Sequence, residues 1–219
     1  MGFIKTLTVS PPSVYINEST DAQSTPVHRP GLFMRIEVAI TDISAQADMQ
    51  VVVNSANANL RLGSGVAGAI HGAAGPELEA YCRQFAPLAA GKAVLSPGFN
   101  LPNAWVIHTV AASFINEPKA ELILAKALDS VMKLVNEHQL ESLAMPAIGT
   151  GVFKCPPELS AELTVRVLAY YRQIGTSLKH VRICVATKSL EDIFNQAIKD
   201  NAITSDSPDI AIAIQNAGF

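Results

Sequence analysis

The sequence has few charged residues, few cysteines and no long apolar run, and each shortage excludes a class of protein. Lys and Arg do not cluster anywhere, and the formal net charge is -3. We therefore expect neither duplex nucleic acid nor a membrane surface as a partner. No apolar run approaches the ~18 residues of a membrane span, and the N-terminus lacks the apolar core of a signal peptide. The expected location is the cytoplasm.

The three cysteines, Cys82, Cys155 and Cys184, are an odd number and form no C-x-x-C pair. This spacing argues against a disulfide framework and against a zinc site. We expect reduced, partly buried thiols, no bound metal and no cofactor.

Apolar residues dominate the chain instead: 49% of its 219 residues are hydrophobic and only 16% are charged. This composition is globular, and the length allows one domain with a sizeable core. Residues 1–33 contain four prolines among polar residues, which predicts an N-terminal extension with an edge strand at Ser13–Ile16. We expect the domain itself at residues 34–201, followed by a tail at 202–219 that packs on it. We expect a monomer.

Predicted strands and helices alternate along most of the chain. Short runs of apolar residues, or of alternating apolar and polar residues, predict the strands. Apolar residues at helical spacing, or a Pro or a capping pattern at the start of a segment, predict the helices. The predicted strands are Met34–Ile40, Gln50–Asn54, Lys92–Leu95, Trp105–Val110, Ser142–Met145 and His180–Ala186. The predicted helices are Pro76–Phe85, Lys119–His138, Pro156–Ile174 and a last one from Ser189. This alternation is typical of an α/β layered domain with a largely parallel sheet.

A glycine-rich stretch, Gly63-Ser64-Gly65-Val66-Ala67-Gly68, fits the G-x-G-x-x-G pattern of dinucleotide-binding turns. A Rossmann turn places these glycines directly after a strand, whereas here nine residues separate Val53 from Gly63. The acidic residue that should follow about 20 positions later is missing, because no Asp or Glu lies between Glu79 and Glu117. A Walker A loop is excluded as well, because no Lys-Ser/Thr pair follows the glycines.

Phosphate binding remains a good interpretation of this stretch. Gly63, Gly65 and Gly68 let the backbone approach a ligand, and a helical register beginning at Ala69-Ile70-His71 turns its amino end the same way. A second loop of small residues, Ala147–Val152, follows the strand at Ser142–Met145. Two such loops at the carboxyl ends of strands could hold a diphosphate from both sides. The alternative is that both are ordinary strand-to-helix turns.

Several stretches together resemble the macrodomains, a family that binds ADP-ribose. In the order of that family they are Val53-Asn54-Ser55-Ala56-Asn57, Gly63-Ser64-Gly65-Val66-Ala67-Gly68-Ala69-Ile70-His71, Ala73-Ala74-Gly75-Pro76, Val106-Ile107-His108-Thr109-Val110 and Pro146-Ala147-Ile148-Gly149-Thr150-Gly151-Val152-Phe153. The resemblance covers roughly Ile36 to Ile198. It implies a three-layer α/β/α sandwich around a central mixed, mostly parallel sheet.

The resemblance also implies a role for each matching residue. Asp42 matches the acid that accepts the adenine amino group, although a helix cap is an alternative. Asn57 matches the asparagine that hydrogen-bonds the distal ribose, and Phe153 the aromatic residue packed on that ribose; without the family, Asn57 fits a turn and Phe153 the core. The implied ligand-binding set is Asp42, Ile43, Asn54, Asn57, Gly63, Ser64, Gly65, Val66, Ala67, Ile148, Gly149, Thr150, Gly151, Val152, Phe153 and Ala186. The implied catalytic residues are Asn57 and His71.

Four positions depart from the family pattern, and a fifth, His71, loses its partner because of one of these departures. Ala67 stands where many family hydrolases carry an Asp that positions water, although viral members with alanine there also cleave ADP-ribose from proteins. His71 matches the histidine that supports this acid, and without its partner it is equally well a structural histidine at a helix start. Gly149 replaces a common serine, Lys154 a common glycine, and Ala186 an aromatic residue often placed against adenine.

We therefore expect an ADP-ribose-binding macrodomain that hydrolyses mono-ADP-ribosyl modifications on proteins, or O-acetyl-ADP-ribose, without a metal. Its expected partners are ADP-ribose and ADP-ribosylated proteins. The alternative from another class is a reader module that binds ADP-ribose without turning it over, and Ala67 is the residue that favours it.

Overall fold

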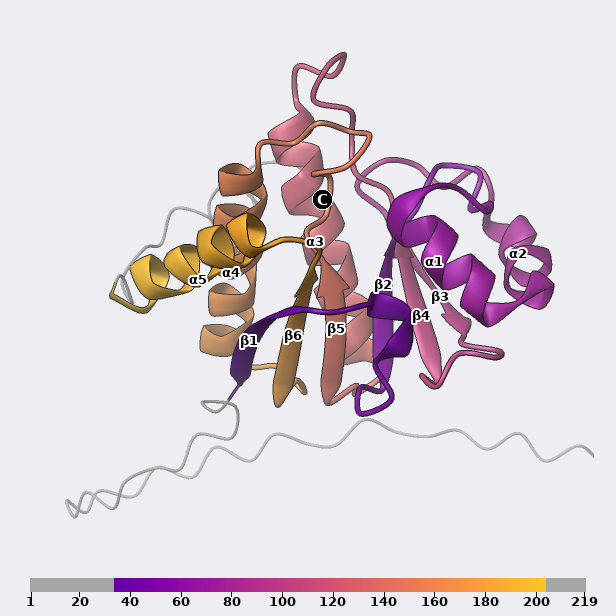
Figure 1. The fold of residues 1–219 in the computed structure, drawn as a ribbon, viewed down its shortest axis with the longest axis horizontal. Helices are drawn as coiled ribbons and strands as arrows, with labels where there is room; N and C mark the ends of the chain where they lie inside the picture. The colour runs from indigo at the N-terminus through magenta and orange to yellow at the C-terminus, as the bar shows by residue number, and fades with distance from the viewer. Residues whose placement is uncertain (1–33, 204–219) are drawn as a thin grey trace, which may run out of the picture.

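A six-stranded sheet forms the centre of the molecule in the computed structural model, which describes residues 34–203 (Figure 1). The strand order is β1-β6-β5-β2-β4-β3. Neighbouring strands are parallel except for the antiparallel pair of β3 and β4 at one edge. The strands are β1 (Arg35–Ile40), β2 (Val51–Ser55), β3 (Ala93–Pro97), β4 (Trp105–Thr109), β5 (Ser142–Pro146) and β6 (His180–Val185).

Helices cover both faces of this sheet. They are α1 (Gly65–Ala74), α2 (Pro76–Cys82), α3 (Ala120–Glu137), α4 (Pro157–Ile174) and α5 (Lys188–Ile203), with short 3-10 turns η1 (Ile43–Ala45) and η2 (Arg83–Phe85). One apolar cluster joins the sheet to α3, α4 and α5, and a second joins its other face to η1, α1 and α2. The predicted three-layer α/β/α sandwich with a mixed, mostly parallel sheet is confirmed.

The run Val51-Val52-Val53 shows why this sheet needs cover on both sides. All three side chains are fully buried, and successive residues of a strand point to opposite faces. Val51 and Val53 accordingly join the cluster under α3 and α4, while Val52 joins the one under α1. A continuous apolar run is typical of a central parallel strand with both faces covered.

The start of α1 corrects one expectation from the sequence. The helix begins at Gly65 rather than Ala69, so Gly68 lies inside it. A Cβ added at Gly68 would lie 2.7 Å from the carbonyl oxygen of Gly63. The glycine therefore serves the close approach of the helix to its own preceding loop, and His71 falls in the last turn of α1 rather than at its start.

The helix expected at Pro76–Phe85 is also shorter than predicted. It ends as an α-helix at Cys82 and continues as the 3-10 turn Arg83–Phe85. The edge strand expected at Ser13–Ile16 and nearly all of the tail lie outside the described residues. Within residues 34–203, no helix is both long and apolar enough to cross a membrane.

Candidate functional site

A cleft of ≈ 380 Å³ opens where the adjacent parallel strands β2 and β5 end. It is lined by the end of β2, the loop into α1 and the loop that follows β5. None of the lining side chains is charged. The lining residues are Ser55, Ala56, Asn57, Gly63, Ser64, Gly65, Val66, Ala67, Ala147, Gly149, Thr150, Gly151, Val152 and Phe153.

Asn57 holds the first loop in shape. Its Nδ2 donates to the carbonyl oxygen of Arg61 at 2.8 Å, and its Oδ1 accepts from the amide of Arg61 at 3.2 Å. The amide of Leu62 then donates to Oε2 of Glu79 on α2 at 3.0 Å. The polar segment between β2 and the glycines is thus a braced loop rather than a flexible one, and Asn57 is both a loop brace and a cleft residue.

The amino end of α1 faces the cleft with unpaired amides. Ser64 occupies the N-cap position, but its side chain makes no capping hydrogen bond. The amides of Gly65, Val66 and Ala67 have no partner among the described residues, because a helix cannot pair its first turn internally. Gly65 has a φ of +56°, and a Cβ placed there would meet nothing within 4 Å. Unpaired amides and the helix dipole together favour an anion at this place.

The loop after β5 presents a second set of unpaired amides. Its carbonyls turn inward: that of Ala147 accepts from the Thr150 hydroxyl at 2.9 Å, and that of Gly149 accepts from the Cys155 amide at 2.9 Å. The amides of Gly151, Val152 and Phe153 bond to no residue in the described part of the chain. An arrangement of successive free amides forms a concave anion site.

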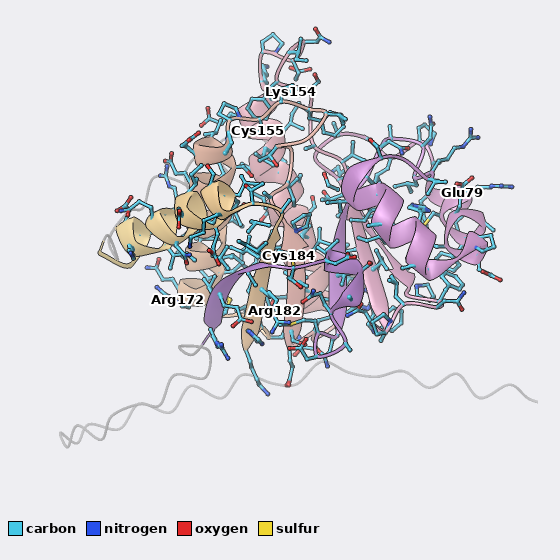
Figure 2. The ribbon with its side chains drawn as sticks, viewed as in Figure 1. Glu79, Lys154, Cys155, Arg172, Arg182 and Cys184 are labelled. Carbon is cyan, nitrogen blue, oxygen red and sulfur yellow. The ribbon has the colours of Figure 1, made fainter. Side chains whose placement is uncertain are left out.

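Backbone geometry explains two departures from the family pattern in this loop. Gly149 has a φ of +85°, and a Cβ there would lie 3.1 Å from the Cβ of Cys155, so Cys155 leaves no room for a serine without a shift. Lys154 has a φ of +57°, a left-handed conformation that costs a non-glycine residue about 1 kcal/mol. Figure 2 shows Lys154 and Cys155 on this loop at the upper end of the molecule.

Asp42 lies at the same end of the parallel strands as the cleft, just beyond the end of β1. Its Oδ1 accepts hydrogen bonds from the amide and the hydroxyl of Ser44, at 2.9 and 2.8 Å, and so caps η1. The backbone hydrogen bond from Ser44, followed by the one from its hydroxyl, holds the pKa of Asp42 below its usual value. No hydrogen bond among residues 34–203 uses Oδ2, which leaves this oxygen free to accept from a ligand. Asp42 is exposed, while Ile43 beneath it is buried.

His108 on β4 faces the core and contacts Asn54 there. The Nδ1 of His108 lies 3.0 Å from Nδ2 of Asn54, and its Nε2 lies 2.9 Å from the Ser96 hydroxyl and 3.4 Å from the Cys82 thiol. Both His108 and Asn54 are fully buried. Burial, with a smaller contribution from His71, lowers the pKa of His108 to about 3.

His71 also lies in the interior, one turn beyond Ala67 on α1. Only 5% of it is exposed, and neither ring nitrogen has a hydrogen-bond partner in the described chain. Burial lowers its pKa, although the nearby Glu79 acts in the opposite direction. Ala67 carries no group that could pair with this ring, so the imidazole is an orphaned buried polar group.

The cleft thus brings together eleven of the expected site residues. Those that it does not include are Asp42, Ile43, Asn54, His71, Ile148 and Ala186. Asp42 and Ala186 still follow β1 and β6 at the same edge of the sheet, whereas Asn54 and His71 belong to the core. Ser55, Ala56 and Ala147 also line the cleft. The implied ligand-binding set does not include them, although they lie in the stretches that match the family.

Comparisons with known proteins agree with this architecture. The sequence model of the Macro domain family matches residues 53–164, slightly more than half of the chain. Macro domain-containing protein RSc0334 of Ralstonia nicotianae is 35% identical over 150 residues, which are 68% of this chain and 86% of that protein. The structure of the Oceanobacillus iheyensis macrodomain with ADP has a TM-score of 0.73 and 29% identity, and covers 77% of this chain and 92% of that one. The chain belongs to the macrodomain family.

A further relative carries an enzyme name. ADP-ribose glycohydrolase MACROD1 of Bos taurus is 37% identical to this chain over 154 residues. The match covers 69% of this chain but only 47% of that protein.

Proposed function

We propose that the cleft binds ADP-ribose, with the diphosphate between its two loops. The observation that carries this proposal is the pair of unpaired amide sets, on α1 and on the loop after β5, in a cleft without any acidic side chain. A diphosphate needs many donors and no nearby carboxylate, which matches this lining. The free Oδ2 of Asp42 would accept from the adenine amino group, and Phe153 and Asn57 would contact the distal ribose.

Calorimetry with ADP-ribose and AMP tests the binding proposal. ADP-ribose should bind more tightly than AMP, because only ADP-ribose carries the diphosphate bridge to a second ribose. Gly65→Glu should abolish binding, since the added side chain enters the cleft and sets a carboxylate against the phosphates. Gly72→Glu is the matched control: it adds the same charge to an exposed site of the same helix. Wild-type protein that gives no heat with millimolar ADP-ribose would refute the proposal.

For the reaction, we infer slow hydrolysis of mono-ADP-ribosyl esters on proteins or of O-acetyl-ADP-ribose. Attack of water on the ribosyl carbon would break its bond to the oxygen of the acceptor carboxyl group. Attack on the ester carbonyl carbon would instead break the bond from that carbon to the ribose oxygen. Either route releases ADP-ribose and a free carboxyl group. Asn57 would hold the distal ribose in the reacting orientation, and a phosphate oxygen would assist the water. The similarity to an ADP-ribose glycohydrolase supports this inference. His71 offers no direct help, because its ring lies outside the cleft lining.

A reader module without turnover is the second candidate, and Ala67 favours it. The methyl group of Ala67 lines the cleft where an acid would otherwise position water. Binding and turnover separate the two candidates. A reader module would bind ADP-ribose but would release no ADP-ribose from a modified protein.

Two variants test the enzymatic proposal. Asn57→Ala should remove turnover while leaving much of the affinity, because an interaction that holds the reacting geometry acts on the rate. The melting temperature must be measured as well, since Asn57 also braces the Arg61 backbone. Ala67→Asp should raise the rate or shift its pH dependence, because the new carboxylate would lie one helical turn from His71. If neither wild type nor Ala67→Asp releases ADP-ribose although both bind it, the reader function stands.

A further inference from the structure

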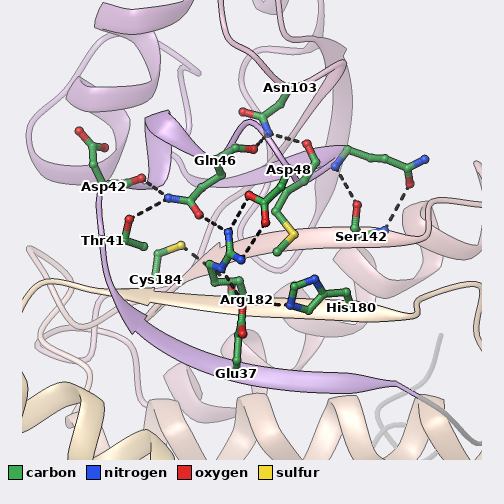
Figure 3. Close-up of polar contacts among 12 residues, drawn as sticks. Glu37, Thr41, Asp42, Gln46, Asp48, Asn103, Ser142, His180, Arg182 and Cys184 are labelled. Atoms are coloured by element: carbon green, nitrogen blue, oxygen red, sulfur yellow. Dashed lines mark hydrogen bonds and ion pairs between the residues drawn. The ribbon is translucent and has the colours of Figure 1, made fainter.

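A polar network lies beside η1, on the face of β1 and β6 that points away from the apolar cluster under α3, α4 and α5 (Figure 3). It joins β1 and β6 to the segment of residues 41–50, which connects β1 to β2 and carries Asp42. Ile36 and Val38 pack into the apolar cluster on the other face of the sheet. Glu37 on β1 therefore points toward η1, and so does Arg182, its register partner on β6.

Arg182 is the centre of this network. Its Nε donates to Glu37 Oε1 at 2.7 Å, and its two terminal nitrogens form a fork to the Asp48 carboxylate, at 2.8 Å each. One of these two nitrogens, Nη1, also donates to Gln46 Oε1 at 2.9 Å. Only 19% of the Arg182 side chain is exposed. A planar guanidinium with bidentate partners is pre-organised, and a lysine could not reproduce it.

The charges of the network agree with this geometry. The hydrogen bond from Arg182 lowers the pKa of Asp48. Burial alone would raise the pKa of Glu37, but hydrogen bonds from Arg182 and His180 outweigh it and lower this pKa. Both carboxylates are therefore ionised at neutral pH, and the pKa of Arg182 is raised, chiefly by its hydrogen bond to Asp48.

Gln46 connects Arg182 to Asp42. Its side chain is 3% exposed and accepts from Arg182 through Oε1. Through Nε2 it donates to the Thr41 hydroxyl at 3.1 Å and to the backbone carbonyl of Asp42. From the opposite side, Asn103 donates to the carbonyls of Gln46 and Met49, at 2.6 and 2.7 Å. The segment is thus held from two sides, and the link from Arg182 to the end that carries Asp42 runs through Gln46.

We propose that Arg182 is a positioning residue for adenine recognition, acting through Gln46 on the backbone of Asp42. This inference rests on the proposed binding of ADP-ribose. Ser44 orients the Asp42 carboxylate within η1, and the hydrogen bonds through Gln46 tie the backbone of Asp42 to Arg182 on the sheet. Arg182 thereby sets the position of η1, and of the free oxygen of Asp42, relative to the sheet. Pre-organising a ligand contact strengthens binding by removing the entropy cost of ordering it.

The test compares ADP-ribose with its hypoxanthine analogue, in which an oxygen replaces the adenine amino group. Wild type should prefer ADP-ribose, because only the amino group donates to Asp42. Arg182→Lys should weaken ADP-ribose binding about tenfold, the loss of roughly one hydrogen bond to a charged group. Its affinity for the analogue should not change. Arg166→Lys is the matched control: it makes the same substitution at an ion pair with Glu162 on α4.

Two further variants keep the test decisive. Gln46→Glu still accepts from Arg182 but can no longer donate to Thr41 and Asp42, so it should also lose the preference for adenine. Asp48→Asn, at a largely exposed site, weakens the hydrogen bonds of the fork only mildly. It replaces Arg182→Lys in the test if Arg182→Lys does not fold. Equal losses for both ligands, or an unchanged preference in folded variants, would overturn the inference. Wild-type protein that fails to bind ADP-ribose would overturn the proposed function and this inference with it.

Discussion

Asp42 has two oxygens with different surroundings, and this asymmetry makes its role testable. Oδ1 caps η1 through Ser44, whereas Oδ2 has no partner in the described structure. A substitution can therefore remove one function and keep the other. One side chain can therefore both cap η1, through Oδ1, and accept a hydrogen bond from adenine, through Oδ2.

We expect Asp42→Ala and Asp42→Asn to separate these two roles. Alanine removes the cap and should lower stability by about 1 kcal/mol. Asparagine keeps one oxygen for Ser44, so the melting temperature should hold. Both variants should lose about 1–3 kcal/mol of ADP-ribose binding, because the second oxygen is gone in each. Calorimetry and thermal melting measure the two effects. Wild-type affinity in Asp42→Asn would show that Asp42 only supports the fold.

Two elements, β4 and α1, each carry a buried histidine that must stay neutral. His108 is hydrogen-bonded and fully buried on β4, and His71 on α1 lies with its ring centroid 6.1 Å from that of His108. A second proton on either ring would be a buried charge in an apolar layer, without a facing carboxylate that pairs with it. Stability should therefore depend on pH up to about 6.5, which is above the range in which most carboxylates titrate.

The sign of this dependence follows from the lowered pKa of His108. Its ordinary pKa is 6.5 and its folded value is about 3, so between these values the unfolded chain binds a proton that the folded chain does not. The stabilisation is complete above pH 6.5 and is lost as the pH falls, with a slope of about 1.4 kcal/mol per pH unit for one such group. Denaturant unfolding between pH 4.5 and 6.5 avoids most carboxylate titration and measures this slope.

His108→Gln should flatten this slope by about that amount, about 1.4 kcal/mol per pH unit, even though the variant is less stable at neutral pH. His138→Gln makes the same substitution at an exposed site beyond α3 and is measured alongside as the control. If His108→Gln showed the same slope of stability against pH as the wild type between pH 4.5 and 6.5, His108 would take up its proton in the folded state.

At the scale of the whole molecule, the sequence predicts what depends on local patterns. The alternation of apolar runs with helical segments predicts where all six strands lie along the chain, although not their order in the sheet. The small residues of the Gly63–Gly68 and Ala147–Val152 segments predict the two loops. The start of α1 was wrong by four residues, because it depends on the contact of Gly68 with the Gly63 carbonyl, which only the folded chain contains.

The Arg182 network could not be predicted for a related reason. Glu37 and Arg182 are far apart in the sequence, and they meet only because β1 and β6 pair in one particular register. The alternation along β6 places Arg182 opposite the apolar cluster that holds Val181 and Ile183. Nothing in the local pattern says which of the many exposed carboxylates would face it. Likewise, Asn54 turns to His108 because β2 and β4 pair directly at these two residues.

The last prediction concerns the boundaries of the folding unit, which we propose to be residues 34–203. Among the described residues, six paired strands and two apolar clusters already form one connected core. A shortened chain of residues 34–203 keeps this core, so we expect it to fold by itself and to melt in a single transition. It should also bind ADP-ribose, because the cleft and Asp42 are retained. Thermal melting and calorimetry on the shortened and the full chain measure both properties, and the difference in melting temperature measures what residues 1–33 and 204–219 add. A shortened chain that fails to fold would show that the folding unit extends beyond residues 34–203.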